Sequence, residues 1–175
     1  MKKILLLIFF VLVIGCASEV SQNLEIKPIT TRLNEGNSSA NLIQYEVIRV
    51  IDGDTVELAN GERLRYNDID TPETVHPSKP IECYGPEASA KNKELVEGKI
   101  ILVELGNPKK DKYGRMLGYV YVNQLFINAE LVKGGYAEVN SYGNPGSKLE
   151  YLYQIESISK KEYNGMWGNC VNDLK

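Results

Sequence analysis

The dipeptide Asn60-Gly61, which lies between two short β-forming runs, restricts the fold of this 175-residue chain more than any other feature. Asn-Gly between two β-forming runs is a strong short-range signal for a β-hairpin. It therefore predicts that Thr55–Leu58 and Arg63–Tyr66 are antiparallel neighbours. Three more β-rich runs are expected, at Leu42–Val50, residues 99–105 and residues 115–122, with a polar loop over residues 106–114.

Helices are expected between and after these runs. Pro86 and Gly98 are typical of the first turn and of the stop of a helix over residues 86–97. A short helix is expected over residues 128–133, and a longer one from about residue 148 to residue 164. Ser147 and Glu150 form a capping-box pattern at the start of the last helix, whose expected apolar face comprises Leu149, Leu152, Ile155 and Ile158. Five strands with three helices indicate a small barrel of the α+β class, mainly β.

The first 15 residues have the pattern of an export signal. Lys2 and Lys3 precede an apolar run over residues 4–14, which is too short to span a bilayer stably. The run ends at Gly15-Cys16, which resembles a bacterial lipobox, so residues 1–15 are predicted to be a lipoprotein signal peptide and Cys16 the lipidated residue. The alternative is ordinary cleavage that leaves a free Cys16 thiol. The first reading predicts an exported lipoprotein, anchored to a membrane and facing the cell surface or the periplasm.

Residues 16–41 are rich in Ser, Asn, Thr and Glu and have no sustained hydrophobic period, so we expect a flexible tether. Such a coil would hold the domain, residues 42–175, about 25–30 Å from the membrane. The chain carries 20 Lys and Arg against 23 Asp and Glu, a formal charge of −3. A protein that grips nucleic acid by charge alone is normally basic. Any polyanion binding must therefore be local to a site, where a metal cation would help.

Two cysteines remain if Cys16 is lipidated. An even pair in an exported chain predicts one disulfide, Cys83–Cys170. The alternative is a pair of buried thiols, because free cysteine is often buried.

Three clusters of charged residues carry the functional signal. Each alone is typical of a turn or a capped loop. If the first strands pair, however, the carboxylates of Asp54, Asp70 and Glu73 converge at one rim of the barrel, where they would repel one another unless a cation bound. Oxygen ligands without a Cys or His cluster indicate Ca²⁺ or Mg²⁺, and the single histidine, His76, argues against a histidine-based site. The clusters are Asp52-Gly53-Asp54-Thr55, the run from Arg65 to Thr74, and Asp111-Lys112-Tyr113-Gly114-Arg115.

Two arginines accompany these carboxylates. Guanidinium groups bind phosphate oxygens in bidentate fashion and stay charged at any working pH. Phosphoryl transfer mainly requires charge neutralisation and an oriented nucleophile. A cation with Arg65 and Arg115 would supply the first requirement, and Glu73 is the candidate to deprotonate or orient water.

The clusters resemble those of the thermonuclease (staphylococcal nuclease-like) family, from about residue 50 to residue 167. This resemblance implies a five-stranded OB-fold β-barrel with three α-helices. It also implies Ca²⁺ bound by Asp54, Asp70 and the Thr71 carbonyl, with Arg65 and Arg115 on the scissile phosphate and Glu73 acting on water. Such enzymes cleave DNA and RNA, single-stranded or locally opened, to 3′-phosphate ends. The matching runs are Asp70-Thr71-Pro72-Glu73-Thr74, Tyr84-Gly85-Pro86-Glu87-Ala88-Ser89-Ala90 and Asp111-Lys112-Tyr113-Gly114-Arg115.

Substrate contacts are implied less completely. Lys79, Lys112 and Tyr113 match family positions near the nucleotide. Of the aromatic residues that stack on a base in the family, only Tyr142 remains, displaced by about one residue, and it could equally be a loop aromatic that covers the core.

Two classes of protein without catalytic activity share part of this pattern. One is a non-catalytic OB-fold lipoprotein that binds nucleic acid or a partner, but such a module is expected to have lost at least one of the five central residues. The other is a lipoprotein in which Ca²⁺ only stabilises the fold, which gives no reason for the paired arginines. A monomer without a protein partner is expected.

Overall fold

The computed structural model describes residues 42–75, 78, 80–141 and 146–170. The chain divides into two compact units, residues 1–37 and residues 38–175, and all described residues belong to the second. The predicted signal peptide (1–15), Cys16 and the tether (16–41) lie outside the described residues, as do His76, Lys79 and Tyr142.

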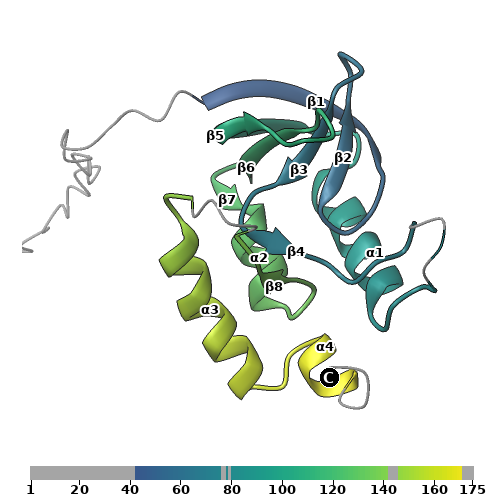
Figure 1. Ribbon diagram of the computed structural model, residues 1–175, viewed down its shortest axis with the longest axis vertical. Coiled ribbons are helices and arrows are strands. Elements are labelled where there is room, and N and C mark those ends of the chain that lie inside the picture. Colours follow the sequence, from purple (N-terminus) through teal and green to yellow (C-terminus); the bar gives the residue numbers. More distant parts are fainter. Residues whose placement is uncertain (1–41, 76–77, 79, 142–145, 171–175) are drawn as a thin grey trace, which may run out of the picture. The chain divides into compact units, whose positions relative to one another are not determined.

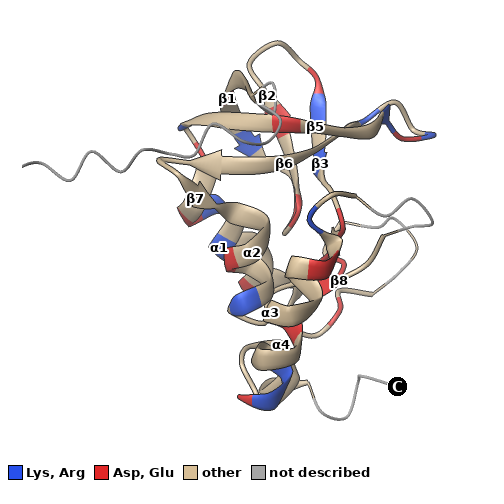
Figure 2. Cartoon of the chain, turned by 90° about the vertical axis from the view of Figure 1, so that its left-hand side faces the viewer, with Lys and Arg blue, Asp and Glu red and all other residues tan. Residues whose placement is uncertain are grey.

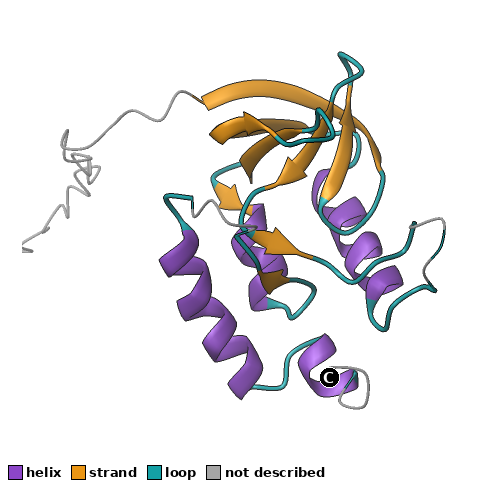
Figure 3. Ribbon diagram, viewed as in Figure 1, coloured by secondary structure: helices purple, strands orange, loops and turns teal. Residues whose placement is uncertain are grey.

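Five strands form a closed barrel (Figures 1 and 3). Neighbouring strands are antiparallel in the order β3-β2-β1-β5-β6, and a parallel pairing of β3 with β6 closes the barrel. The predicted five-stranded OB-fold barrel is therefore confirmed. The strands are β1 (Leu42–Val50), β2 (Thr55–Leu58), β3 (Arg63–Tyr66), β5 (Ile100–Lys110) and β6 (Met116–Val122).

Three two-residue strands supplement the barrel. β7 (Leu125–Phe126) continues from β6, while β4 (Ile69–Asp70) pairs with β8 (Glu138–Val139) in a separate ladder. This ladder is small, but it fixes the position of Asp70, because Ile69 and Asp70 pair with Val139 and Glu138. The sequence did not predict β4 or β8.

The three predicted helices are α1 (Gly85–Val96), α2 (Ile127–Lys133) and α3 (Leu149–Lys161). A single turn, α4 (Met166–Asn169), follows them. All four lie on the same side of the barrel in Figure 3. In the part of the chain that the structure describes, no helix is long and apolar enough to cross a membrane.

The core fills the barrel and continues beneath α2. Leu64 and Tyr66 point inward from β3, whereas Arg63 and Arg65 alternate with them on the outer side of the strand. Within the core, the Tyr66 hydroxyl donates to Asn92 Oδ1 (2.9 Å). Asn92 Nδ2 in turn donates to the Asp52 carbonyl oxygen (3.1 Å). This buried relay ties the barrel, α1 and the β1–β2 loop together, which holds that loop in place.

Tertiary contacts overrule two local predictions for α3. The capping box at Ser147 is wrong: α3 begins after Lys148 without a side-chain cap, and the Lys148 N–H donates to the Tyr119 hydroxyl (3.2 Å) instead. Ile158 is 56% exposed, so the expected apolar face is wrong at that position. The buried face turns toward Glu156, because its carboxylate accepts the Val139 N–H of β8 (2.8 Å).

The polar loop expected over residues 106–114 is shorter than predicted. β5 runs through Lys110, which pairs with Met116 of β6. The remaining turn is closed by the Asp111 N–H, which donates to the Arg115 carbonyl oxygen (3.0 Å). The β5–β6 turn therefore projects as the tip of a long hairpin.

Cys83 and Cys170 form a disulfide with a Cα–Cα distance of 5.9 Å, which confirms the predicted pair and excludes two free thiols. Cys83 lies just before α1 and Cys170 just after α4, and 87 positions separate them. The bond therefore connects the segment between β4 and α1 with the C-terminal end of the described chain.

Replacing both cysteines with serine should lower the free energy of unfolding by about 2–5 kcal/mol, because the unfolded chain regains the freedom that the long loop closure removes. Urea denaturation of wild type and of Cys83→Ser/Cys170→Ser, each with and without a reductant, measures this. The reductant should destabilise only the wild type. Equal stability of wild type under both conditions would contradict a structural role for the bond.

Candidate functional site

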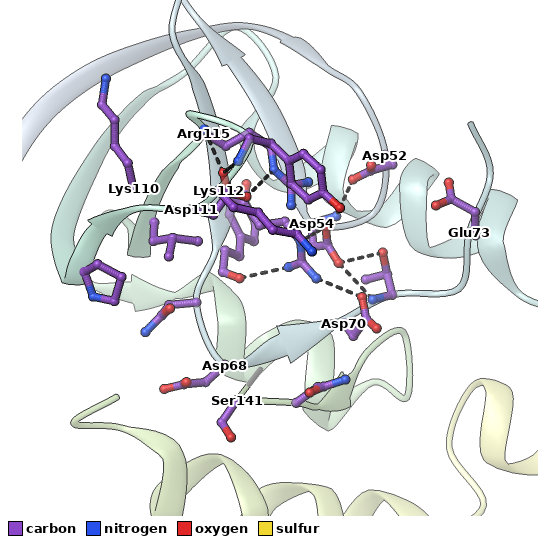
Figure 4. Close-up of a pocket in the computed structure, with 18 of the residues that line it drawn as sticks. Asp52, Asp54, Asp68, Asp70, Glu73, Lys110, Asp111, Lys112, Arg115 and Ser141 are labelled. Carbon is purple, nitrogen blue, oxygen red and sulfur yellow. Dashed lines mark hydrogen bonds and ion pairs between the residues drawn. The ribbon is translucent and has the colours of Figure 1, made fainter. Parts of the chain in front are cut away.

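A cleft of about 590 Å³ opens between the barrel and the segments around β4 and β8 (Figure 4). It collects eight of the residues singled out from the sequence, which come from the β1–β2 loop, β3, β4 and the segment after it, and the β5–β6 turn. Asn140 and Ser141 close one side. The eight residues are Asp54, Arg65, Asp70, Thr71, Glu73, Lys112, Tyr113 and Arg115.

Arg65 lies in the middle of this cleft and is only 7% exposed. Its Nε lies 3.1 Å from Asp54 Oδ1 and its Nη2 2.8 Å from Asp70 Oδ1. Its Nη1 donates to two carbonyl oxygens, those of Tyr66 (2.9 Å) and Ile69 (2.8 Å). One guanidinium therefore connects the β1–β2 loop, β3 and β4.

Asp54 is 3% exposed and held on both oxygens. Thr71 donates to its Oδ2 twice, from the backbone N–H (2.8 Å) and from the hydroxyl (3.0 Å). Burial raises the pKa of Asp54 from 3.8 to about 6. The Arg65 charge and the Thr71 donors oppose this shift, and the neighbouring Asp52 charge adds to it.

Gly53 allows Thr71 to approach Asp54 this closely. A Cβ at position 53 would lie 2.6 Å from the Thr71 hydroxyl oxygen, so a larger residue would displace Thr71. The Asp-Gly pair predicts a turn from sequence, but its second role, as the surface against which Thr71 packs, was missed. Asp52 was also missed: its Oδ1 accepts the Asp54 N–H (3.1 Å) and fixes the loop.

Glu73 lies at the edge of the cleft rather than beside Asp54 and Asp70 (Figure 4). Its Oε1 accepts the N–H groups of Thr74 (2.9 Å) and Val75 (2.8 Å). Within the described residues no group of three acidic, histidine or cysteine side chains could hold one metal ion. Asp54, Asp70 and Glu73 line one cleft, as expected, but their carboxylates do not form a single metal-binding cluster, because Glu73 accepts hydrogen bonds from its own loop. Two carboxylates, Asp54 and Asp70, do meet.

Glu82 holds the Glu73 backbone and was not singled out from the sequence. Its Oε2 accepts the Glu73 N–H (2.9 Å), and its own N–H donates to the Glu73 carbonyl oxygen (2.9 Å). Only the structure reveals this pairing, because it links two segments of the loop between β4 and α1.

Arg115 is oriented by Asp111 at the tip of the β5–β6 hairpin. Its Nε lies 2.7 Å from Asp111 Oδ2, and its backbone N–H donates to Asp111 Oδ1 (2.9 Å). Although partial burial raises the pKa of Asp111, hydrogen bonds and charge from Arg115 outweigh it and lower the pKa overall. The Arg115 terminal nitrogens have no partner among the described residues, so they are available to an anion. The sequence did not assign Asp111 this role.

Tyr113 stands beside Arg115 with 71% of its surface exposed. Lys112 Nζ lies 5.0 Å and Arg115 Cζ 5.5 Å from the centre of its ring. An exposed ring flanked by two cations suits a base and its phosphate.

The charge of the cleft fits a divalent cation. Among the described lining residues are six carboxylates and four cationic side chains, a formal charge of −2. An anionic phosphate would be repelled by this excess. Asp54, Asp70 and Thr71 offer only oxygen ligands, which Ca²⁺ and Mg²⁺ prefer, so these residues fit the predicted metal. The carboxylates are Asp52, Asp54, Asp68, Asp70, Glu73 and Asp111, and the cations are Arg65, Lys110, Lys112 and Arg115.

Comparisons with known proteins identify relatives over most of the domain. Residues 63–169 match the family model of staphylococcal nuclease homologues. The chain is 36% identical over 137 residues to a thermonuclease of Staphylococcus hyicus, which covers 77% of this chain and 81% of that protein. It is 37% identical over 127 residues to a thermonuclease of Staphylococcus intermedius, covering 70% and 75% respectively. It is also 37% identical over 131 residues to endonuclease YncB of Bacillus subtilis (strain 168), covering 72% of this chain and 62% of that protein.

The pKa of Asp54 predicts a pH-dependent stability in protein freed of divalent cations. Because the folded-state pKa (about 6) exceeds the unfolded value (3.8), the contribution of Asp54 is present below the unfolded pKa and lost as pH rises through about 6. Relative to Asp54→Asn, wild type should lose on the order of 2–3 kcal/mol between about pH 4 and about pH 7. Urea denaturation in EDTA across this range measures the loss.

Asp111→Asn is the matched control, because the pKa of Asp111 is lowered and its contribution has the opposite sign. Relative to that variant, wild type should gain stability as pH rises through the acid range. A difference between wild type and Asp54→Asn that does not change with pH would contradict the raised pKa.

Proposed function

Because this chain belongs to the staphylococcal nuclease family and is a nuclease, we propose that it hydrolyses both DNA and RNA in a Ca²⁺-dependent reaction that leaves 3′-phosphate ends. The observation that carries this proposal is the position of Arg65 between the carboxylates of Asp54 and Asp70. That arrangement combines cation ligands and a phosphate ligand within one cleft.

Asp54, Asp70 and the Thr71 carbonyl would hold the Ca²⁺. When bound, the cation would neutralise the excess charge of the cleft and stabilise the charge that develops on the phosphate. The all-oxygen ligand set suits Ca²⁺ or Mg²⁺, and Ca²⁺ is the ion that the resemblance to the thermonuclease family implies.

The two arginines would both bind the scissile phosphate, but they differ in how their donors are occupied without it. Asp111 fixes Nε of Arg115 and leaves its terminal nitrogens available. Arg65 is engaged by both carboxylates. It would turn donors toward the phosphate when those carboxylates serve as ligands instead.

Glu73 would orient or deprotonate the attacking water. Its Oε1 is held by the Thr74 and Val75 N–H groups, whereas its Oε2 accepts no hydrogen bond from the described residues. The second oxygen is therefore the one free to bind water. Its distance from Asp54 and Asp70 suits a role in handling water rather than in direct metal ligation.

Lys112 and Tyr113 would contact the nucleotide, as their exposed positions beside Arg115 allow. Lys79 and Tyr142 keep the same proposed role, although both lie outside the described residues. A monomeric enzyme that acts on single-stranded or locally opened strands fits this site. A non-catalytic module is disfavoured, because Asp54, Arg65, Asp70, Glu73 and Arg115 are all present.

We further propose that the enzyme is exported and anchored through a lipidated Cys16. The proposal is supported by Lys2 and Lys3, the apolar run over residues 4–14 and the Gly15-Cys16 junction. Two or more acyl chains suffice for stable anchoring.

The Glu73→Ser variant should cleave single-stranded DNA and RNA slower than wild type by about two orders of magnitude or more, because the group that handles the attacking water is lost. EGTA should stop the wild-type reaction and added Ca²⁺ should restore it. The products should resist 3′ extension by a polymerase until a phosphatase removes the terminal phosphate. Gel analysis of labelled substrates measures all three.

Glu87→Ser is the matched control, since Glu87 is an exposed carboxylate of α1 that lies outside the cleft. It should retain wild-type activity. Wild-type cleavage rates in Glu73→Ser, with an unchanged unfolding transition, would refute the assignment of Glu73. Full activity in EGTA would refute the metal proposal.

Cys16→Ala should abolish lipid attachment while leaving the nuclease domain folded. Metabolic labelling with a palmitate analogue should mark wild type but not the variant, and globomycin should block processing of wild type only. An unlabelled wild-type protein that is fully released into the medium would show that Cys16 is not an anchor.

A further inference from the structure

A second, shallower groove of about 840 Å³ adjoins the cleft. The β2–β3 turn and the beginning of β3 form one wall, and the β5–β6 turn forms the other. Glu73, Lys110, Tyr113 and Arg115 line both hollows, so the groove continues the cleft past Tyr113. Its remaining lining residues are Gly61, Glu62, Arg63 and Gly114.

Arg63 is the unassigned cation of this groove. It is exposed, and within the described residues its guanidinium has no hydrogen-bond or ion-pair partner. Side chains two positions apart on a strand share one face and lie roughly 6.6 Å apart. Arg63 therefore stands one repeat from Arg65 on the outer face of β3, which is the scale of one nucleotide step in an extended strand.

Lys110 supplies a second cation from the opposite wall. Its Nζ lies 2.8 Å from Glu62 Oε1, and both side chains are well exposed, at 55% and 38%. An exposed ion pair of this kind is weak, so a phosphate can replace Glu62 as the partner of Lys110. Figure 2 shows basic residues at the beginning of β3 and around the turn between β5 and β6.

Tyr113 lines both hollows and is 71% exposed. Bases stack on such rings without regard to sequence. A strand that passes Tyr113 would present its next phosphate to the groove in which Arg63 and Lys110 lie.

We infer that this groove binds the single-stranded polynucleotide where it leaves the catalytic cleft, with Arg63 and Lys110 on the backbone phosphates flanking the scissile one. The inference rests on the proposed function and adds a binding site for substrate beyond the bond that is cut. Such a site would make the enzyme favour longer strands over a dinucleotide, because a dinucleotide is too short to reach both hollows.

Arg63→Ala should raise KM for long single-stranded DNA about two- to fivefold at low salt, with kcat unchanged. Both constants for a dinucleotide with one phosphodiester bond should stay at their wild-type values. In the Glu73→Ser background, where the strand is not cut, fluorescence anisotropy should show weaker binding of a labelled oligothymidine. The slope of log affinity against log salt should fall by about 0.7, the value of one phosphate contact on a single strand.

Arg49→Ala is the control, because Arg49 is also an exposed arginine, on β1, where it pairs with Glu57 and lines neither hollow. It should leave KM and the salt slope unchanged. The inference is overturned if Arg63→Ala affects both substrates equally, or affects neither. If wild type cuts neither substrate, the proposed function fails, and the anisotropy comparison still decides whether the groove binds the strand.

Discussion

The site depends on one buried guanidinium shared by two carboxylates. Arg65 joins Asp54 of the β1–β2 loop to Asp70 of β4, and the same side chain donates to two carbonyl oxygens of the intervening chain. Removing one member of such a buried group typically costs about 3–5 kcal/mol, because a charge is left without compensation. Two negative charges nevertheless face one positive charge, and burial already resists the ionisation of Asp54. A divalent cation would resolve both conflicts, and under the proposed function the ligands would complete the charge balance of the site.

The local charge balance of the site also explains how an acidic protein can act on a polyanion. The chain has a formal charge of −3, so its surface as a whole does not attract nucleic acid. The cations proposed to bind the strand instead lie along the cleft and the groove that continues it. Arg65 lies inside the cleft, Arg115 and Lys112 at the tip of the β5–β6 hairpin, and Arg63 one repeat along β3. Once a divalent cation offsets the acidic excess of the cleft, attraction would be restricted to the route that a strand would follow, and binding should be strongly sensitive to salt.

Features that depend on neighbours in the sequence were predictable. The Asn60-Gly61 turn specified the pairing of β2 with β3, and the charged clusters identified the residues that share the cleft. Features decided by distant partners were not. The Ser147 capping pattern does not form, because the N–H of Lys148 donates to the Tyr119 hydroxyl, 29 positions earlier in the chain. The orientation of Glu73 was not predictable for a different reason: its carboxylate accepts the N–H groups of its own neighbours, Thr74 and Val75, and no motif specifies a side-chain rotamer.

The central claim is that a cation and a phosphate bind together at Asp54, Arg65 and Asp70. Calorimetric titration of Ca²⁺ into the Glu73→Ser protein, with and without a short single-stranded oligonucleotide, tests it directly. Because the two ligands complete one charge balance, each should strengthen the binding of the other by the same factor, and Asp70→Asn should abolish this coupling. Calcium affinity that is identical with and without the oligonucleotide, or no calcium binding at all, would contradict the claim.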